Sequence, residues 1–99
     1  MLSSNYSEDR ACVYLGGDLV FSDHGKFREI LTHTAGSGLP HLKLDFSGLT
    51  FIDSAGLGML LLLRDEAAKR GQTVTLANAG KQVKRMFEIS RFNSIFKVE

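Results

Sequence analysis

Asp53 and Ser54 stand side by side at the start of the stretch DSAGLGMLLLLRDEAAKRG, residues 53–71. A carboxylate can cap a helix or act as an acid or base, and a serine hydroxyl can act as a nucleophile or accept a phosphate. Two glycines, Gly56 and Gly58, follow within five residues, and a run of leucines comes after them. The sequence therefore raises the question of whether this pair is only a helix cap or a functional site.

The pattern predicts a helix that begins at Ser54 or Ala55, because Asp53 supplies the side-chain oxygen that an N-cap needs. Glycine costs about 1 kcal/mol against alanine inside a helix, so Gly56 and Gly58 weaken its first turns. Their missing side chains would let another group approach the positive end of the helix dipole. A phosphate on Ser54 would be well placed there.

The leucine run that follows is apolar around most of the helix, whereas packing on a sheet needs only one stripe. Its members are Leu57, Met59, Leu60, Leu61, Leu62 and Leu63. Two interpretations stay open at this point. A neighbouring helix covers the outward side chains, or they form an exposed docking patch beside a modifiable hydroxyl.

Catalysis by Ser54 is not supported by its surroundings in the sequence. A nucleophile elbow needs glycine two residues before the serine, and Ile52 occupies that position. The three histidines, His24, His33 and His41, each lie in or beside polar stretches typical of a surface. No acidic pair follows the first long strand, as a phosphate-accepting receiver domain would require. The sequence therefore predicts no enzyme and no catalytic residue.

Length and composition restrict the remaining function classes. Ninety-nine residues with 43% hydrophobic content predict one domain, residues 1–99, with a single core. Cys12 is the only cysteine, and no cysteine or histidine pair has metal-site spacing, so we expect no disulfide, metal or cofactor. A net charge of +1 is too balanced for nucleic-acid binding. No segment reads as a signal peptide or membrane span, so we expect a cytoplasmic protein that does not bind a membrane.

Hydrophobic periodicity predicts short strands that alternate with helices. We expect strands near residues 2–6, in 11–21 with a break at Gly16-Gly17, in 41–46, in 72–78 and in 94–98, and helices over 22–35, 54–70 and 80–90. Ser22 or Asp23 would cap the first helix, and Gly36 would follow its end. In the third strand, apolar residues alternate with Lys43 and Asp45, which indicates a sheet covered by helices mainly on one face.

Three stretches of the chain resemble one known family. LDFSGLTFIDSAGLGMLL is similar to the signature of STAS domains, in particular of the anti-sigma factor antagonists of bacterial partner-switching systems. LGGDLV and VKRMFEISRFNSIFKV resemble the early and C-terminal patterns of the same family, so the resemblance covers residues 11–98. It implies an α/β STAS fold, with a four- to five-stranded mixed sheet and helices packed on it.

The resemblance also implies a function. Ser54 would be the phosphorylated serine, and Asp53, Ala55, Gly56, Leu57, Gly58 and Leu61 would form the partner-binding helix start. The partners would be an anti-sigma factor that doubles as a serine kinase of the GHKL type, and a PP2C-type phosphatase. Val20 stands where the family's early motif has an acidic residue. The unphosphorylated protein, a monomer or weak dimer, would sequester the anti-sigma factor and so regulate transcription.

One alternative remains open within the same family. The chain could be a STAS subunit of a larger lipid-transport or stress-sensing complex, in which Ser54 is only a helix cap.

Overall fold

The computed structural model describes all 99 residues as one α/β unit with a five-stranded mixed sheet and three α-helices. The strands are β1 (Leu2–Tyr6), β2 (Cys12–Leu19), β3 (His41–Ile52), β4 (Thr73–Ala77) and β5 (Lys97–Val98). The helices are α1 (His24–Ser37), α2 (Ser54–Lys69) and α3 (Lys81–Ile89), with short 3-10 turns η1 (Phe21–Asp23) and η2 (Phe92–Ser94). The predicted α/β architecture, a mixed sheet with helices packed on it, is confirmed.

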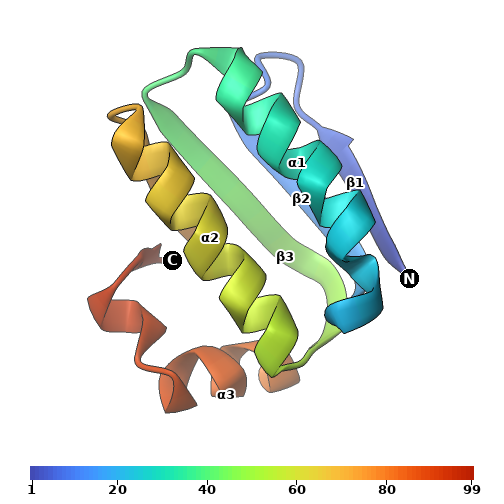
Figure 1. Ribbon diagram of the computed structural model, residues 1–99. Coiled ribbons are helices and arrows are strands. Elements are labelled where there is room, and N and C mark those ends of the chain that lie inside the picture. Colours follow the sequence, from blue (N-terminus) through green and yellow to red (C-terminus); the bar gives the residue numbers. More distant parts are fainter.

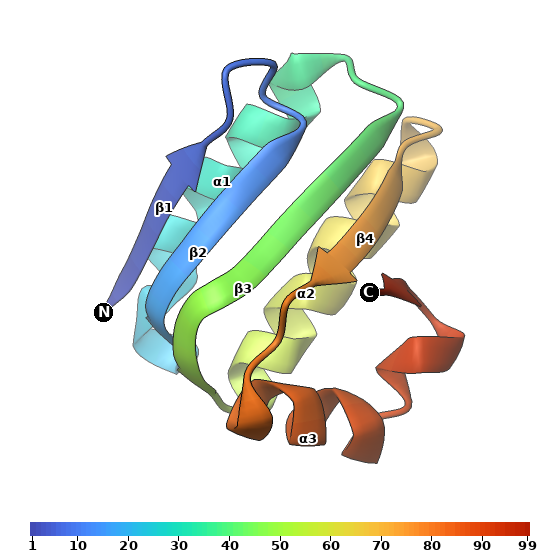
Figure 2. The same ribbon diagram turned by 180° about the vertical axis from the view of Figure 1, so that it is seen from behind.

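The sheet has the spatial order β1-β2-β3-β4-β5. β1 runs antiparallel to β2, and the other neighbouring strands are parallel. Helices α1 and α2 lie side by side on one face of this sheet (Figure 1). Seen from behind, the opposite face of β1 to β4 carries no helix (Figure 2). The alternation of apolar and polar residues in β3 therefore predicted the layering correctly.

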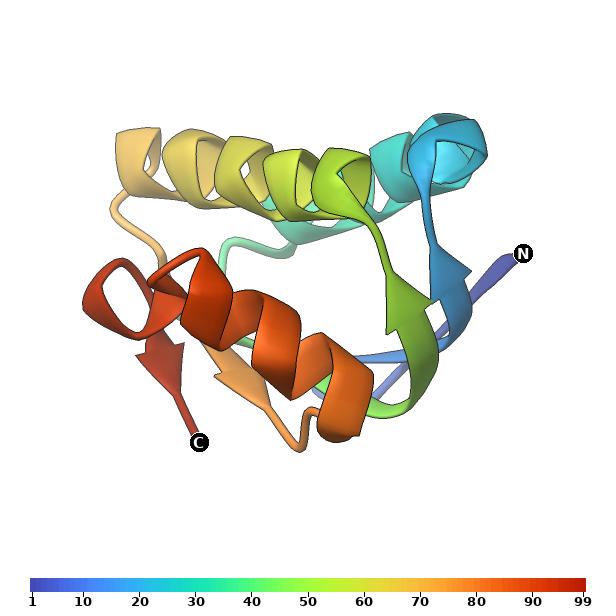
Figure 3. The ribbon, with the colours of Figure 1, turned by 90° about the horizontal axis from the view of Figure 1, so that it is seen from below.

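The parallel strands bring three connections to one end of the sheet. The chain leaves β2, β3 and β4 at this end to enter α1, α2 and α3, respectively. α3 lies at this end of the sheet, on the side where α2 starts, rather than over either face of the sheet (Figure 1, Figure 3). Residues that follow these three strands are therefore brought together.

The core lies between the sheet and the α1–α2 layer and extends beneath α3. It contains 20 buried apolar residues in one cluster, including Phe46, Phe87 and Phe92. The rings of Phe46 and Phe87 meet edge to face at 5.2 Å between centroids, and Phe87 stacks on Phe92 at 5.4 Å. Aromatic pairs at this spacing add stabilisation beyond their buried area, so they fix α3 and η2 against the end of the sheet.

Several element ends differ from those predicted. β2 continues through Gly16-Gly17 with two register shifts instead of breaking there. A β-carbon at Gly16 would lie 2.7 Å from Ser3 Oγ, so the glycine permits close pairing with β1. α1 runs to Ser37, and the residue that ends it is Gly38, with φ of 67°, not Gly36. The last strand has only two residues, because η2 precedes it.

The predicted cap of α1 also differs. Asp23 precedes α1 but makes no side-chain cap bond to it. Its buried carboxylate instead accepts the backbone N–H groups of Leu2 at 3.1 Å and Val20 at 3.0 Å. Asp23 therefore joins the first strand to the turn after β2, a long-range role that local helix signals cannot predict.

His33 of α1 packs against the end of β1. Its ring stacks on Tyr6 with 3.6 Å between centroids, and its Nε2 atom is buried without a hydrogen-bond partner. Burial lowers the pKa of His33 below 6.5, and the nearby Arg10 adds to this effect. Protonation of His33 is therefore less favourable in the folded state than in the unfolded chain.

We predict that stability falls as the pH drops below about 6.5, because the unfolded chain then binds a proton that the folded His33 resists. His33→Phe keeps an aromatic ring against Tyr6 but removes the imidazole group that binds the proton. Its urea-unfolding free energy should change less between pH 7.5 and 5.5 than that of the natural chain. Equal losses in both proteins would contradict the assignment to His33.

Candidate functional site

Asp53 joins the start of α2 to the turn that follows β2. Its Oδ1 atom accepts the backbone N–H of Gly56 at 2.8 Å, which makes Asp53 the N-cap of α2. Its Oδ2 atom accepts the backbone N–H of Phe21 at 3.3 Å. The backbone N–H of Asp53 donates to Leu19 O, also at 3.3 Å. One residue therefore fixes the carboxyl ends of β2 and β3 relative to α2.

Ser54 is the first residue of α2 and is exposed. Because Asp53 caps the helix, the Ser54 hydroxyl is not needed for capping, and no hydrogen bond within the protein involves it. The Asp53 cap uses the backbone N–H of Gly56, and those of Ser54 and Ala55 lie in the same first turn, where the helix dipole is positive. The hydroxyl is therefore accessible, and the helix start favours a negative group beside it.

The two glycines of this turn have different structural roles. Gly56 is buried, and a β-carbon there would clash with the carbonyl oxygen of Leu19 and lie 2.7 Å from Ile52 Cγ1. Gly58 is exposed, and a β-carbon there would meet nothing within 4 Å. The space at Gly56 is thus filled by the end of β2. The expectation that Gly56 leaves room for an outside group is wrong, and only Gly58 has open space beside it.

The leucine run divides between core and surface. Leu57, Leu60 and Leu63 are buried, with Leu57 only 7% exposed. Met59 and Leu61 are partly buried and pack against the same core. The sequence left open whether a neighbouring helix covers the run. The core, including Leu31 of α1, covers most of it, and Leu57 cannot present its side chain to a partner.

Leu62 is the exception in this run, with 48% of its surface exposed. It lies on the outward side of α2 with Ser54 and Gly58, at i, i+4 and i+8 spacing, and borders a shallow groove shared with Leu31 and Ala35 of α1. We call Ser54, Gly58 and Leu62 the outward stripe of α2. Of the predicted partner-binding residues, Asp53, Ala55 and Leu61 are partly exposed, and their role stays a prediction.

Two residues at this site were not predicted from the sequence. Phe21 was assigned to the strand, but it begins η1 and is 71% exposed beside Asp53. Gln82 of α3 makes two hydrogen bonds of 2.9 Å, to the backbone N–H and C=O of Ile52. An exposed phenylalanine after a strand gives a weak sequence signal. The pairing of Gln82 with a residue 30 positions earlier gives none.

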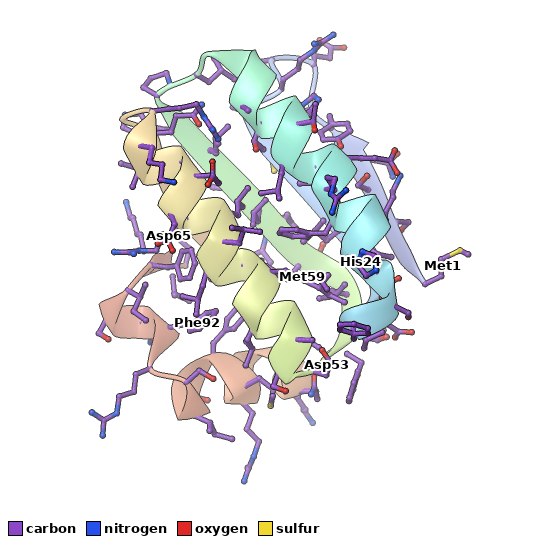
Figure 4. All side chains as sticks on the ribbon, in the orientation of Figure 1. Met1, His24, Asp53, Met59, Asp65 and Phe92 are labelled. Atoms are coloured by element: carbon purple, nitrogen blue, oxygen red, sulfur yellow. The ribbon has the colours of Figure 1, made fainter.

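Phe21 of η1, Asp53 before α2 and Gln82 of α3 therefore meet at one end of the molecule. Asp53 and His24 lie at this same end, at the starts of their helices (Figure 4). None of the three histidines makes a hydrogen bond with the Ser54 hydroxyl. The arrangement presents an accessible hydroxyl next to exposed apolar groups.

Other titratable side chains lie away from this end or serve the fold. Burial acts to raise the pKa of Asp45, but hydrogen bonds from Ser47 and Asn78 outweigh it, and the pKa lies below its ordinary value. Burial raises the pKa of the Cys12 thiol.

No group of three or more His, Cys, Asp or Glu side chains is placed to hold a metal ion. None of the three α-helices combines the length and apolar character needed to cross a membrane.

Comparison with known proteins identifies the family. The family model described as "Mlab, STAS domain" matches residues 4–98. The chain belongs to the STAS-domain family. A STAS-domain containing protein of Pseudomonas aeruginosa (strain UCBPP-PA14) is 34% identical over 86 residues, which span 87% of this chain and 84% of that protein.

Several solved structures have the same fold. An anti-sigma factor antagonist from Mycobacterium paratuberculosis superposes with a TM-score of 0.85 at 15% identity, covering 99% of this chain and 85% of that one. Unphosphorylated SpoIIAA, an anti-sigma factor antagonist, gives a TM-score of 0.70 at 18% identity, with 100% and 87% covered. A sulfate transporter family protein from Wolinella succinogenes gives 0.76 at 14% identity, with 95% and 79% covered.

The two glycines provide a direct test of the site geometry. We predict that Gly56→Ala destabilises this STAS domain by about 1–3 kcal/mol, because its β-carbon must displace the Leu19 carbonyl. Gly58→Ala should instead stabilise it by up to about 1 kcal/mol, since alanine is the better helix former. Urea unfolding of both variants measures the difference. Equal effects at both positions would show that the turn after β2 does not pack on Gly56.

Proposed function

We propose that this STAS domain is an anti-sigma factor antagonist whose binding to its partner is switched by phosphorylation of Ser54. The proposal rests on the different roles of two neighbouring residues at the start of α2. Asp53 caps the helix through Gly56, while the neighbouring Ser54 hydroxyl is exposed and makes no bond within the protein. An accessible serine that the fold does not need is free to serve regulation.

The proposed partners follow from the resemblance to anti-sigma factor antagonists. They are an anti-sigma factor that is also a GHKL-type serine kinase, which would phosphorylate Ser54, and a PP2C-type phosphatase, which would remove the phosphate. Proteins of similar fold are described as anti-sigma factor antagonists, and SpoIIAA has been solved in unphosphorylated and phosphorylated forms. These likenesses support the proposal for the present chain.

The proposed docking surface consists of the outward stripe of α2 and Phe21. Phe21 and Leu62 supply exposed apolar groups of the kind that a partner buries. Ser54 lies next to Asp53, whose carboxylate accepts the backbone N–H of Phe21. The hydroxyl therefore stands at the edge of the apolar surface, where it would enter the interface.

Phosphorylation would add about −2 charge to this surface. A hundredfold loss of affinity corresponds to about 2.7 kcal/mol, and a dianion placed within an apolar contact can exceed that through desolvation and repulsion. The positive end of α2 would at the same time tolerate the phosphate. The switch would therefore act on binding while the fold persists.

A second function is favoured by the description of the matching family, which is not that of an antagonist, and by the similar fold of a sulfate transporter family protein. In this alternative the chain is a STAS subunit of a larger complex, for lipid transport or stress sensing, and binds its partner constitutively. Such a subunit would need no modification at Ser54. Its binding would therefore be insensitive to charge at that position.

Substitution of Ser54 separates the two functions. We predict that Ser54→Asp weakens binding to a purified GHKL-type kinase of the source organism by about tenfold or more, because it places a charge in the interface. Ser54→Ala should bind about as well as the natural chain and should not be phosphorylated by that kinase in the presence of ATP. Calorimetry and a phosphorylation assay measure these effects.

Asn93→Asp is the matched control, since it adds the same charge at an exposed position of η2. Loss of binding in this variant as well would indicate a general charge effect. If Ser54→Asp and Ser54→Ala both bind normally, the switch is ruled out.

The outward stripe can be tested separately from Ser54. We predict that Leu62→Lys weakens partner binding by about tenfold with little change in thermal stability, because the side chain is half exposed. Ile89→Lys, at a more exposed position of α3, should bind normally. Leu57→Lys should instead unfold the protein, because it places a charge in the core. Similar losses for Leu62→Lys and Ile89→Lys would place the docking surface elsewhere.

A further inference from the structure

A cleft of about 670 Å³ opens at the outer edge of β4, between α2 and the segment that leads into β5. Its walls include Arg64 and Ala68 of α2, Val74 of β4, and Ile95 and Lys97 of the chain that leads into and forms β5. Its volume is in the range that small-molecule sites occupy in proteins. The cleft is therefore large enough for a ligand.

The cleft exists because β5 is too short to cover β4. β5 pairs only with Thr75 and Leu76, so the first two residues of β4, Thr73 and Val74, have no strand on their outer side. The carbonyl oxygen of Ile95, two residues before β5, instead accepts the Nε–H of Arg64 on α2 at 3.2 Å. This bond holds the segment before β5 against α2 and fixes one wall of the cleft.

The charged side chains that line the cleft are both basic. They are Arg64 and Lys97, and no aspartate or glutamate lines it. The nearest acid along β5, Glu99, pairs with Lys43 at 3.0 Å instead of with Lys97. The Lys97 ammonium group has no carboxylate within 4 Å, so its charge is not neutralised by the protein.

Arg64 keeps donors for a ligand. Its Nη1 atom lies 3.4 Å from the Asp65 carboxylate, which points to the side of α2 away from α1 (Figure 4). Guanidinium has five N–H donors, and this contact and the bond to Ile95 use only part of them. The hydroxyl of Thr75 adds a further donor at the rim of the cleft, whereas that of Thr73 is already bonded to His41 Nδ1 at 2.6 Å.

We propose that this cleft binds a small organic anion. Its carboxylate or phosphate group contacts Lys97 and Arg64, and its apolar part lies on Ala68, Val74 and Ile95. Arg64 follows Ser54 by ten residues on α2, which is about 15 Å of helix rise. The cleft is therefore separate from the proposed phosphorylation site, and its ligand does not depend on the switch.

The test uses the full chain labelled with ¹⁵N and three probes: hexanoate, inorganic phosphate and the neutral amide hexanamide. Hexanoate should cause saturable amide shift changes confined to residues 64–75 and 95–97, and hexanamide should cause none. If phosphate shifts the amide signals of the same residues and hexanoate shifts none, the head group of the ligand is a phosphate. Hexanoate binding alone would assign it to a carboxylate.

Lys97→Gln should weaken binding of the active probe by about tenfold, because a charge-assisted hydrogen bond is lost. Lys69→Gln, at an exposed position of α2 outside the cleft, is the matched control and should bind normally. Arg64→Gln should weaken binding to a similar degree, provided that its amide spectrum shows that the variant is folded. Equal binding of hexanoate and hexanamide, shifts spread over all exposed lysines, or no saturable binding of either anion would each overturn the proposal.

Discussion

The Asp53 carboxylate is the contact on which the functional end of this STAS domain depends. Each of its oxygens accepts one backbone N–H, from Gly56 in α2 and from Phe21 in η1. A cap normally stabilises only its own helix, by about 1 kcal/mol. Here the same group also sets the position of an exposed aromatic side chain that lies 32 residues earlier in the sequence. Because Asp53 performs both tasks, the adjacent hydroxyl of Ser54 is left without a structural role.

The second constraint is the packing of α2 on a sheet that is covered on one face only. The helix must bury Leu57, Leu60 and Leu63, and it must also approach the end of β2 closely enough for Gly56 to touch the Leu19 carbonyl. This approach orients the rest of the first turn. Ser54 and Gly58 consequently point outward on the same side as Leu62. The packing of the buried residues of α2 therefore determines where the outward stripe, which is proposed to bind a partner, is placed.

Sequence patterns predicted the features that depend on interactions between residues close in the sequence. The helix from Ser54, its cap at Asp53 and the covering of the sheet by helices on one face (Figure 1) follow from residues close in sequence, and each was found as expected. Asp45, which alternates with apolar residues in β3, is instead buried, and its carboxylate accepts hydrogen bonds from Ser47 and Asn78. Features that depend on distant residues were missed or wrong. The carboxylate of Asp23 is used by Leu2, and the space at Gly56 is filled from β2. The two-residue β5, whose shortness opens the cleft beside β4, depends on how η2 packs.

The Ser54 hydroxyl, exposed and without a structural bond, is proposed to be regulatory. Intact-mass measurement and phosphosite mapping of the protein, purified from its native host under several growth conditions, would test this directly. We expect a fraction of the protein to carry one phosphate, located on Ser54, in a proportion that changes with conditions. A protein that is never phosphorylated, or that carries its phosphate at another residue, would show that Ser54 is not the regulatory serine.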